Sequence, residues 1–216
     1  MGCYLGYLVG KNGYHVTIIE ENERIGVPVQ CTGILTSQIT KVLPMDPSFL
    51  VNTITKTRVF SPENEFVEFE LSDNYIVSRV FFDSHFADMA KKVGAEILTQ
   101  TKYLRYNQKT KEVHYHNNQE EKTMKTDFLV GCDGPSSKVF SLINTKKRKY
   151  WIGLQATAKL ANDNVVEFYP WIRTYAWVVP ENKDIVRIGI ALPDGPHARD
   201  TFKKFLRFRL GEHYQE

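Results

Sequence analysis

The 216-residue chain carries 28 Lys and Arg against 25 Asp and Glu, a formal net charge of +3. Because this excess is small and the two signs are interspersed, nucleic acid is not an expected partner. The three cysteines, Cys3, Cys31 and Cys132, follow no CxxC spacing. This argues against a zinc site or a disulfide framework and indicates a reducing, cytoplasmic setting. No apolar run approaches the roughly 18 residues that span a bilayer. The six histidines show no metal-ligand pattern, so no metal is expected.

The first residues predict a helix, a turn and a strand. Residues 4–9 place apolar side chains at helical spacing, and Gly13 marks the stop. Residues 15–19, HVTII, form a β-branched run typical of a strand covered on both faces. A further helix is expected near residues 36–42, after a stretch rich in Pro and Gly.

The middle of the chain predicts antiparallel strands around one amphipathic helix. Residues 57–60 and 66–71 alternate in polarity around the turn SPEN, and residues 74–78 form another strand. The helix is expected over residues 79–93, ending at Gly94. Residues 96–126 then give two or three polar strands, with Asn117-Asn118 as a hairpin turn.

An apolar run reappears at residues 127–131, DFLVG, and predicts a buried strand. It leads into CDGPSS, whose serines can cap a helix that extends to Ile143. Four more strands are expected near residues 153–160, 165–169, 175–179 and 186–192. A basic, aromatic helix over residues 200–210 follows; its pattern suits a membrane-interface helix, but also a helix of a substrate domain.

These elements predict an α/β protein. We expect a parallel α/β core interrupted by antiparallel β insertions, followed by a second, β-rich region. The predicted division is residues 1–149 for the first domain, which lacks its first strand, and residues 150–216 for the second.

The start of the chain has the spacing of a dinucleotide site. Such a site needs glycines at the phosphate loop, a helix N-terminus, and an acid about 20 residues further on that binds the ribose. Glu20 ends the predicted strand, and Gly2 lies where the last glycine of GxGxxG would fall. The motif alone is weak, because helix-turn-strand-Glu occurs in many α/β proteins.

Four later segments carry a family resemblance. GVPVQCTG (26–33) is similar to a PxxCxG motif, and YIVSRVFFD (75–83) to a strand-Arg-helix step. DFLVGCDGPSS (127–137) is similar to GADGxxS, and YAWVVP (175–180) to YxWxFP. On these motifs the chain resembles the geranylgeranyl reductase family of FAD-dependent oxidoreductases, within the class that includes the aromatic-ring hydroxylases. The resemblance implies a Rossmann-like FAD/NAD(P)-binding domain with antiparallel β insertions, followed by part of a β-rich substrate domain.

The sequence departs from the family pattern in two ways. Val179 replaces an aromatic residue of YxWxFP, and the family's later Gly-Asp motif has no counterpart. The resemblance therefore predicts a chain that is truncated at both ends and that binds FAD poorly.

The resemblance implies roles for six residues at the FAD site. Gly2 would belong to the phosphate loop, Glu20 would accept from the ribose, and Arg79 would pair with the pyrophosphate. Asp133 and Gly134 would contact the cofactor at the end of the apolar run, and Arg24 is a weaker candidate. Ordinary alternatives are a solvated acid at Glu20, an ion pair between Arg79 and Asp83, an Asp-Gly turn at residues 133–134, and a solvated loop cation at Arg24.

The resemblance also implies residues beside the flavin ring and the substrate. Cys31 and Gly33 would lie next to the flavin, where the Cys31 thiol could shape the site or deliver a proton. A small packing residue is the alternative for Cys31. Tyr175 and Trp177, two residues apart on one strand face, would line an apolar tunnel for an isoprenoid chain. A hydrophobic core face is the alternative for that pair.

The predicted function is that of an FAD-dependent oxidoreductase of lipid biosynthesis. It would reduce C=C bonds of an isoprenoid, geranylgeranyl-type lipid by hydride transfer from reduced flavin. The reductant would be an external donor, either NAD(P)H or a ferredoxin-like protein. The alternatives are a flavin-dependent monooxygenase or halogenase of the same class, or a non-catalytic fragment. Localisation is expected to be cytoplasmic; peripheral membrane contact and the oligomeric state stay open.

Overall fold

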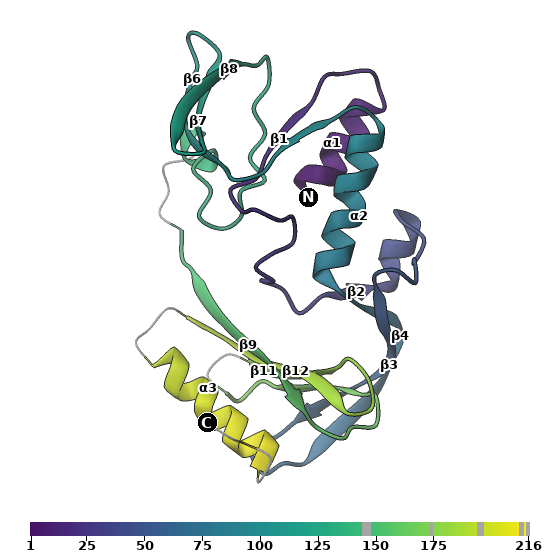
Figure 1. The fold of residues 1–216 in the computed structure, drawn as a ribbon. Helices are drawn as coiled ribbons and strands as arrows, with labels where there is room; N and C mark the ends of the chain where they lie inside the picture. Colours follow the sequence, from purple (N-terminus) through teal and green to yellow (C-terminus); the bar gives the residue numbers. More distant parts are fainter. Residues whose placement is uncertain (144–147, 173–174, 194–196, 212–213, 215–216) are drawn as a thin grey trace. The chain divides into compact units, whose positions relative to one another are not determined.

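The computed structural model describes residues 1–143, 148–172, 175–193, 197–211 and 214. The chain divides into two compact units. The first unit joins Met1–Gln30 to Arg79–Arg148, and the second joins Cys31–Ser78 to Lys149–Glu216. The colours of Figure 1 follow the chain from the first unit into the second, back into the first at Arg79, and into the second again at Lys149.

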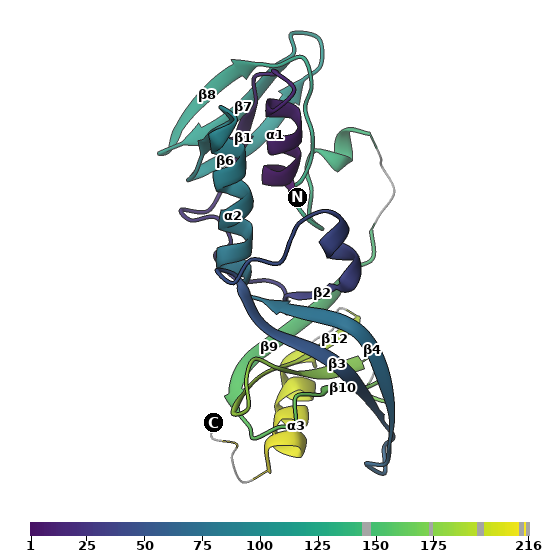
Figure 2. The ribbon, with the colours of Figure 1, turned by 90° about the vertical axis from the view of Figure 1, so that its right-hand side faces the viewer.

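Two helices and two parallel strands form the centre of the first unit. Helices α1 (Gly2–Gly10) and α2 (Arg79–Lys92) lie side by side in Figures 1 and 2. Strand β1 (Thr17–Ile19) pairs in parallel with β5 (Glu96–Leu98). Small residues let α1 approach its neighbours, since a Cβ at Gly6 would lie 2.7 Å from Ile18 Cδ1. The predicted helix, turn and strand are confirmed.

A three-stranded antiparallel sheet completes the first unit. It consists of β6 (Thr101–Asn107), β7 (Glu112–Asn117) and β8 (Glu120–Lys125). Asn118 and Gln119 have positive φ angles of 49° and 70°, the backbone that a two-residue hairpin requires. The expected hairpin is therefore confirmed, and its turn is formed by Asn118-Gln119, one residue after the predicted Asn117-Asn118.

The apolar run 127–131 is not a strand, so that prediction is wrong. Phe128 is 86% exposed and Val130 60% exposed. A strand buried on both faces needs paired strands beside it, and within the described ranges β1 pairs only with β5. The prediction of a helix from the serines to Ile143 is also wrong: the segment forms only the short 3-10 helix η2 (Phe140–Leu142).

A seven-stranded sheet forms the second unit, in the order β2-β4-β3-β10-β11-β12-β9. Only β3 and β10 pair in parallel, and the other neighbours are antiparallel. Where a helix was expected near residues 36–42, β2 is followed by the 3-10 helix η1 (Ser37–Lys41). The strands are β2 (Ile34–Thr36), β3 (Leu50–Phe60), β4 (Phe66–Val77), β9 (Trp151–Lys159), β10 (Val166–Tyr169), β11 (Tyr175–Pro180) and β12 (Ile185–Pro193).

The pairing of β3 with β10 groups the chain differently from the predicted domains. Thr57 pairs with Val166, and this contact brings residues 31–78 into one unit with residues 149–216. The sequence division placed residues 31–78 with the first domain. Local periodicity does not reveal a pairing over such a separation, which explains the difference.

Helix α3 (Ala198–Leu210) covers one face of this sheet. Phe205, 2% exposed, packs with Val178, Ile188 and Ile190, none of which is more than 1% exposed. On the edge strand β9, even-numbered residues pack against this cluster while odd-numbered residues are exposed. None of the helices within the described ranges is long and apolar enough to cross a membrane.

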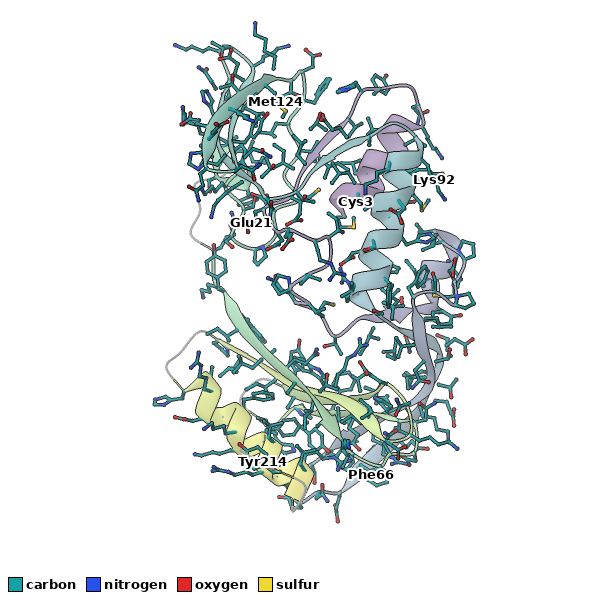
Figure 3. The ribbon with its side chains drawn as sticks, viewed as in Figure 1. Cys3, Glu21, Phe66, Lys92, Met124 and Tyr214 are labelled. Carbon is teal, nitrogen blue, oxygen red and sulfur yellow. The ribbon has the colours of Figure 1, made fainter. Side chains whose placement is uncertain are left out.

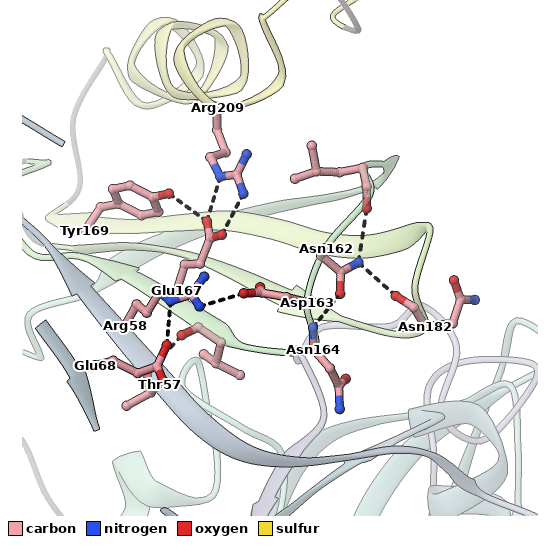
Figure 4. Close-up of polar contacts among 12 residues, drawn as sticks. Thr57, Arg58, Glu68, Asn162, Asp163, Asn164, Glu167, Tyr169, Asn182 and Arg209 are labelled. Atoms are coloured by element: carbon pink, nitrogen blue, oxygen red, sulfur yellow. Dashed lines mark hydrogen bonds and ion pairs between the residues drawn. The ribbon is translucent and has the colours of Figure 1, made fainter. Parts of the chain in front are cut away.

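An ion pair between a partly buried arginine of α3 and a buried glutamate of β10 links the helix to the sheet. In Figure 4, Glu167 of β10 lies between Arg209 of α3 and Tyr169. Arg209 Nε and Nη2 each donate to Glu167 at 2.6 Å, and Tyr169 donates to it at 2.6 Å. The hydrogen bonds to Glu167 raise the pKa of Arg209, and burial beside that carboxylate raises the pKa of Tyr169. The guanidinium therefore stays charged and the phenol neutral.

Candidate functional site

The N-terminus of α1 lies against the segment that contains Asp133. A Cβ at Gly2 would lie 3.5 Å from Cys132 Cβ, an ordinary contact distance. The first turn of α1 has no acidic residue and no side-chain cap. Its amide groups are therefore not neutralised by the helix itself, and this arrangement fits the phosphate groups of a dinucleotide.

Asp133 holds the turn that follows the apolar run. Its carboxylate accepts from the Ser137 hydroxyl and from the Lys138 amide at 2.8 Å. Burial alone would raise the pKa of Asp133, but the hydrogen bonds from Ser137 and from backbone amides outweigh it and lower the pKa. Asp133 is thus ionised at neutral pH. Gly134 has a φ of +75°, and a Cβ there would meet nothing within 4 Å, so the backbone is open to close approach.

Glu20 lies directly after β1. Its amide donates to Leu98 O at 2.9 Å, which continues the β1–β5 ladder. Its Oε1 accepts from the amide and the side-chain nitrogen of Asn22, both at 2.8 Å. Among the described residues no hydrogen bond reaches Oε2, so one carboxylate oxygen is free to accept from a ribose hydroxyl.

Arg79 begins α2 and pairs with Asp83 one turn later. Its Nη2 lies 2.8 Å from both carboxylate oxygens, so the expected alternative, the local ion pair, is present. Gly26, in the loop after β1, has a φ of +78°. A Cβ added at Gly26 would lie 3.1 Å from Arg79 O, so the loop passes close to the start of α2. Val27 donates to Arg24 O at 3.3 Å. The loop carrying Arg24 therefore packs against the start of α2, near Arg79.

In the second unit, the segment Cys31-Thr32-Gly33 lies against the sheet face opposite α3. Thr32 Oγ1 donates to Gln155 Oε1 of β9 at 2.6 Å. The strand register places Gln155, Gly189 and Trp177 in one cross-strand row, so their side chains share a face. We call this face, with Tyr175, Trp177, Gly189, Gly153, Gln155 and Trp151, the open face.

Trp177 lies flat across the open face because its neighbour is a glycine. A Cβ at Gly189 would come within 2.4 Å of Trp177 Cζ2. The Tyr175 ring lies beside it with centroids 5.6 Å apart and the two planes tilted by 39°. Tyr175 is 41% exposed and Trp151 is 55% exposed. The indole Nε1 of Trp177 is buried and has no acceptor among the described residues. The open face therefore combines aromatic surface with one unused donor.

Within each unit the structure brings predicted residues together. The first unit gathers Gly2 with Asp133 and Gly134, and its loop that contains Arg24 and Gly26 packs against the start of α2 at Arg79. The second gathers Cys31 and Gly33 with Tyr175 and Trp177, through the contacts of Thr32. Sequence reasoning missed Gln155, Gly189 and Arg187. The one available signal was the lone arginine in the apolar run VRIGIAL at residues 186–192.

The cysteines differ in their surroundings. Cys31 is exposed, and its sulfur accepts from the Gly33 amide at 3.4 Å. Cys3, labelled in Figure 3 at the start of α1, is partly buried, and burial raises the pKa of its thiol. A protonated, partly buried thiol suits a packing role for Cys3.

The family model for an FAD binding domain matches residues 51–183. The chain belongs to the FAD binding domain family. FAD is accordingly its cofactor, and the residues described above fit that cofactor: uncompensated amides at α1, an open glycine at Gly134, and a free oxygen on Glu20.

Several curated relatives carry the name digeranylgeranylglycerophospholipid reductase. The digeranylgeranylglycerophospholipid reductase of Methanocaldococcus jannaschii is 26% identical over 89% of this chain and 53% of its own length. The same-named protein of Methanocella arvoryzae is 25% identical over 98% of this chain and 60% of its own length. The predicted resemblance to geranylgeranyl reductases is confirmed. The chain spans about half the length of the curated relatives it matches.

Solved structures of other proteins share the fold. A geranylgeranyl bacteriochlorophyll reductase-like protein from Thermoplasma acidophilum aligns with a TM-score of 0.81 at 21% identity, over 97% of this chain and 59% of the other. The flavin-dependent halogenase CmlS aligns with a TM-score of 0.74 at 14% identity, over 100% and 46%. The predicted fold class, a Rossmann-like FAD domain with β insertions and part of a β-rich domain, is confirmed.

Proposed function

We propose that this chain forms the cofactor-binding and substrate-facing parts of a flavin-dependent reductase of C=C bonds in isoprenoid lipids. The observation that carries the proposal is the open face, where the Cys31 segment, Tyr175 and Trp177 share one side of one sheet. An aromatic surface with few polar groups suits a polyisoprenoid chain, which offers apolar area and no charge. The names of the curated relatives support the same substrate class.

The residues of the chain would divide the work between cofactor and substrate. The amides of α1, the Asp133-Gly134 turn and Glu20 would hold the phosphate and ribose parts of FAD. Bound FAD would accept two electrons from an external reductant, as hydride from NAD(P)H or singly from a ferredoxin-like protein, and would supply hydride to the substrate. Tyr175 and Trp177 would orient the isoprenoid chain. After hydride reaches one carbon of the double bond, a proton must reach the other, from the Cys31 thiol, a tyrosine or water.

The test supplies the chain with saturating FAD, a chemical reductant and a geranylgeranyl-bearing phospholipid under anaerobic conditions. Mass spectrometry should show a gain of two hydrogen atoms for each reduced double bond. Trp177→Ala should weaken this activity, while Trp171→Ala is the matched control, since Trp171 packs on Phe208 of α3 with ring centroids 5.5 Å apart. A product that forms only in air and carries oxygen or halogen would instead assign the monooxygenase or halogenase function.

The proposed substrate also leads us to propose where in the cell the protein acts. A cytoplasmic protein that acts on membrane lipid would make peripheral contact with the membrane. Sedimentation with lipid vesicles that contain the substrate, compared with vesicles that lack it, measures that contact. Binding to neither kind of vesicle would contradict this part of the proposal.

A further inference from the structure

Arg187 is a buried arginine on the open face that no cofactor or substrate role explains. It lies on β12 and is 8% exposed. Its neighbours in the strand are apolar, and it shares the face of Gly189 and Trp177 because residues two apart on a strand point the same way. Burying a guanidinium is unfavourable unless its donors are used, so the partners of Arg187 indicate its purpose.

The partners of Arg187 come from the Cys31 segment, from the end of β4 and from the hairpin between β11 and β12. Nη1 donates to Thr32 O and also to Val77 O at 3.0 Å. Nε donates to Glu181 Oε1 at 2.5 Å, in the hairpin between β11 and β12. One side chain thus connects the Cys31 segment, the end of β4 and the strand pair that carries Trp177.

A second strand supports the same segment. Gln155 of β9 accepts from Thr32 Oγ1 at 2.6 Å, and the Val77 amide donates to Gly33 O at 2.9 Å. Thr32 is therefore held at its carbonyl by Arg187 and at its hydroxyl by Gln155. These contacts fix the backbone directly after Cys31, at Thr32 and Gly33, although the Cys31 side chain itself is exposed.

We infer that Arg187, held by Glu181, is a positioning residue that fixes the Cys31 segment against the open face and so sets the shape of the isoprenoid site. The inference rests on the proposed function for the identity of that site. Arg187 itself touches backbone carbonyls and Glu181, and it acts on the substrate only through Cys31, Thr32 and Gly33. A guanidinium suits this task because it directs several donors from one rigid plane.

The first measurement is hydrogen exchange in three variants. Arg187→Met removes every donor, and Arg187→Lys keeps the charge with a single nitrogen. Arg58→Met is the matched control, because Arg58 also lies in this sheet and pairs with Glu68 and Asp163 away from the Cys31 segment. Arg187→Met should speed exchange of the amides of residues 32–34 and 77 by roughly tenfold, with Arg187→Lys between it and wild type. Arg58→Met should leave these amides unchanged.

The second measurement is lipid reduction by the same variants at saturating FAD. Arg187→Met should raise KM for the geranylgeranyl lipid severalfold while the rate of flavin reduction by the external donor stays at the wild-type value. Arg58→Met should change neither quantity. A purely structural arginine would lower the amount of active protein without this selective change in KM.

The outcomes are separable. If wild type reduces no isoprenoid lipid, the proposed function fails, and hydrogen exchange still decides whether Arg187 holds the segment. If exchange in Arg187→Met equals that in Arg58→Met, the inference is overturned. Faster exchange with an unchanged KM would overturn the positioning role as well, because the segment would then be held without any effect on the substrate.

Discussion

Phe205 and Phe128 are the same side chain in opposite surroundings, one in each unit. Phe205 of α3 is 2% exposed and packs on the seven-stranded sheet, whereas Phe128 is 86% exposed beside the Asp133 turn. The second unit closes a core with its own strands and helix. In the described part of the first unit, the turn that begins at Asp133 is held by polar hydrogen bonds instead. Apolar packing therefore holds Phe205 and its surroundings in the second unit, whereas hydrogen bonds hold the Asp133 turn in the first.

The largest expected effect is that of truncating Phe205, compared with the same truncation at Phe128. Phe205→Ala should lower the free energy of unfolding by about 3–5 kcal/mol, because it leaves a cavity in a close-packed core. Phe128→Ala should change it by less than about 0.5 kcal/mol, since the ring is already in water. Urea denaturation measures both. All three tryptophans lie in the second unit, so their fluorescence follows that unit alone, and circular dichroism follows the whole chain. Equal losses for the two variants would contradict the comparison.

The next effect separates buried from exposed ion pairs. Glu167→Ala should cost about 3 kcal/mol, because it leaves the Arg209 charge without its partner in a partly buried site. The control in the first unit is Lys111→Met, which breaks the pair with Asp127. There both side chains are more than half exposed. That variant should cost no more than about 0.5 kcal/mol. A large effect at Lys111 would show that polar contacts stabilise the first unit more than its exposure indicates.

A smaller effect tests the open face. Gly189→Ala should cost about 1–3 kcal/mol, because the new methyl group overlaps Trp177 and must displace the indole. Displacement should also shift the tryptophan emission to longer wavelength. Gly153→Ala on the neighbouring strand is the control, since a Cβ there would meet nothing within 4 Å. An unshifted emission spectrum in Gly189→Ala would contradict the flat position of Trp177.

Local patterns predicted most elements of both units. The helix α1, the strand β1, the hairpins and the strands β9 to β12 follow from periodicity and turn residues, which act over a few positions. The error at residues 127–131 has another origin. An apolar run shows what a segment can bury, but its burial depends on strands that pair with it, and in the described ranges none pairs with DFLVG.

The candidate site divides in the same way. Motif spacing identified Cys31, Trp177 and Asp133, because each lies in a short segment with a recognisable pattern. It did not identify Arg187, whose partners at residues 32 and 77 are more than 100 positions away. Nor did it group residues 31–78 with the second unit, which depends on the parallel pairing of β3 with β10. Such contacts are properties of the folded chain rather than of any local segment.

The smallest effect concerns Asp133 and depends on pH. The folded protein lowers the pKa of this carboxyl, so its contribution to stability is present above the unfolded value of about 3.9 and is lost as pH falls through the lower folded value. Because Asp133 lies near solvent, we expect Asp133→Asn to cost no more than about 1 kcal/mol at pH 7. Near pH 3 the difference between wild type and variant should narrow. Denaturation followed by circular dichroism at both pH values measures this, with Asp127→Asn as the control at a nearby exposed carboxylate. A difference that stays constant between the two pH values would show that the turn before η2 is held by its shape, and that the charge of Asp133 has little part in keeping Gly134 open to the cofactor.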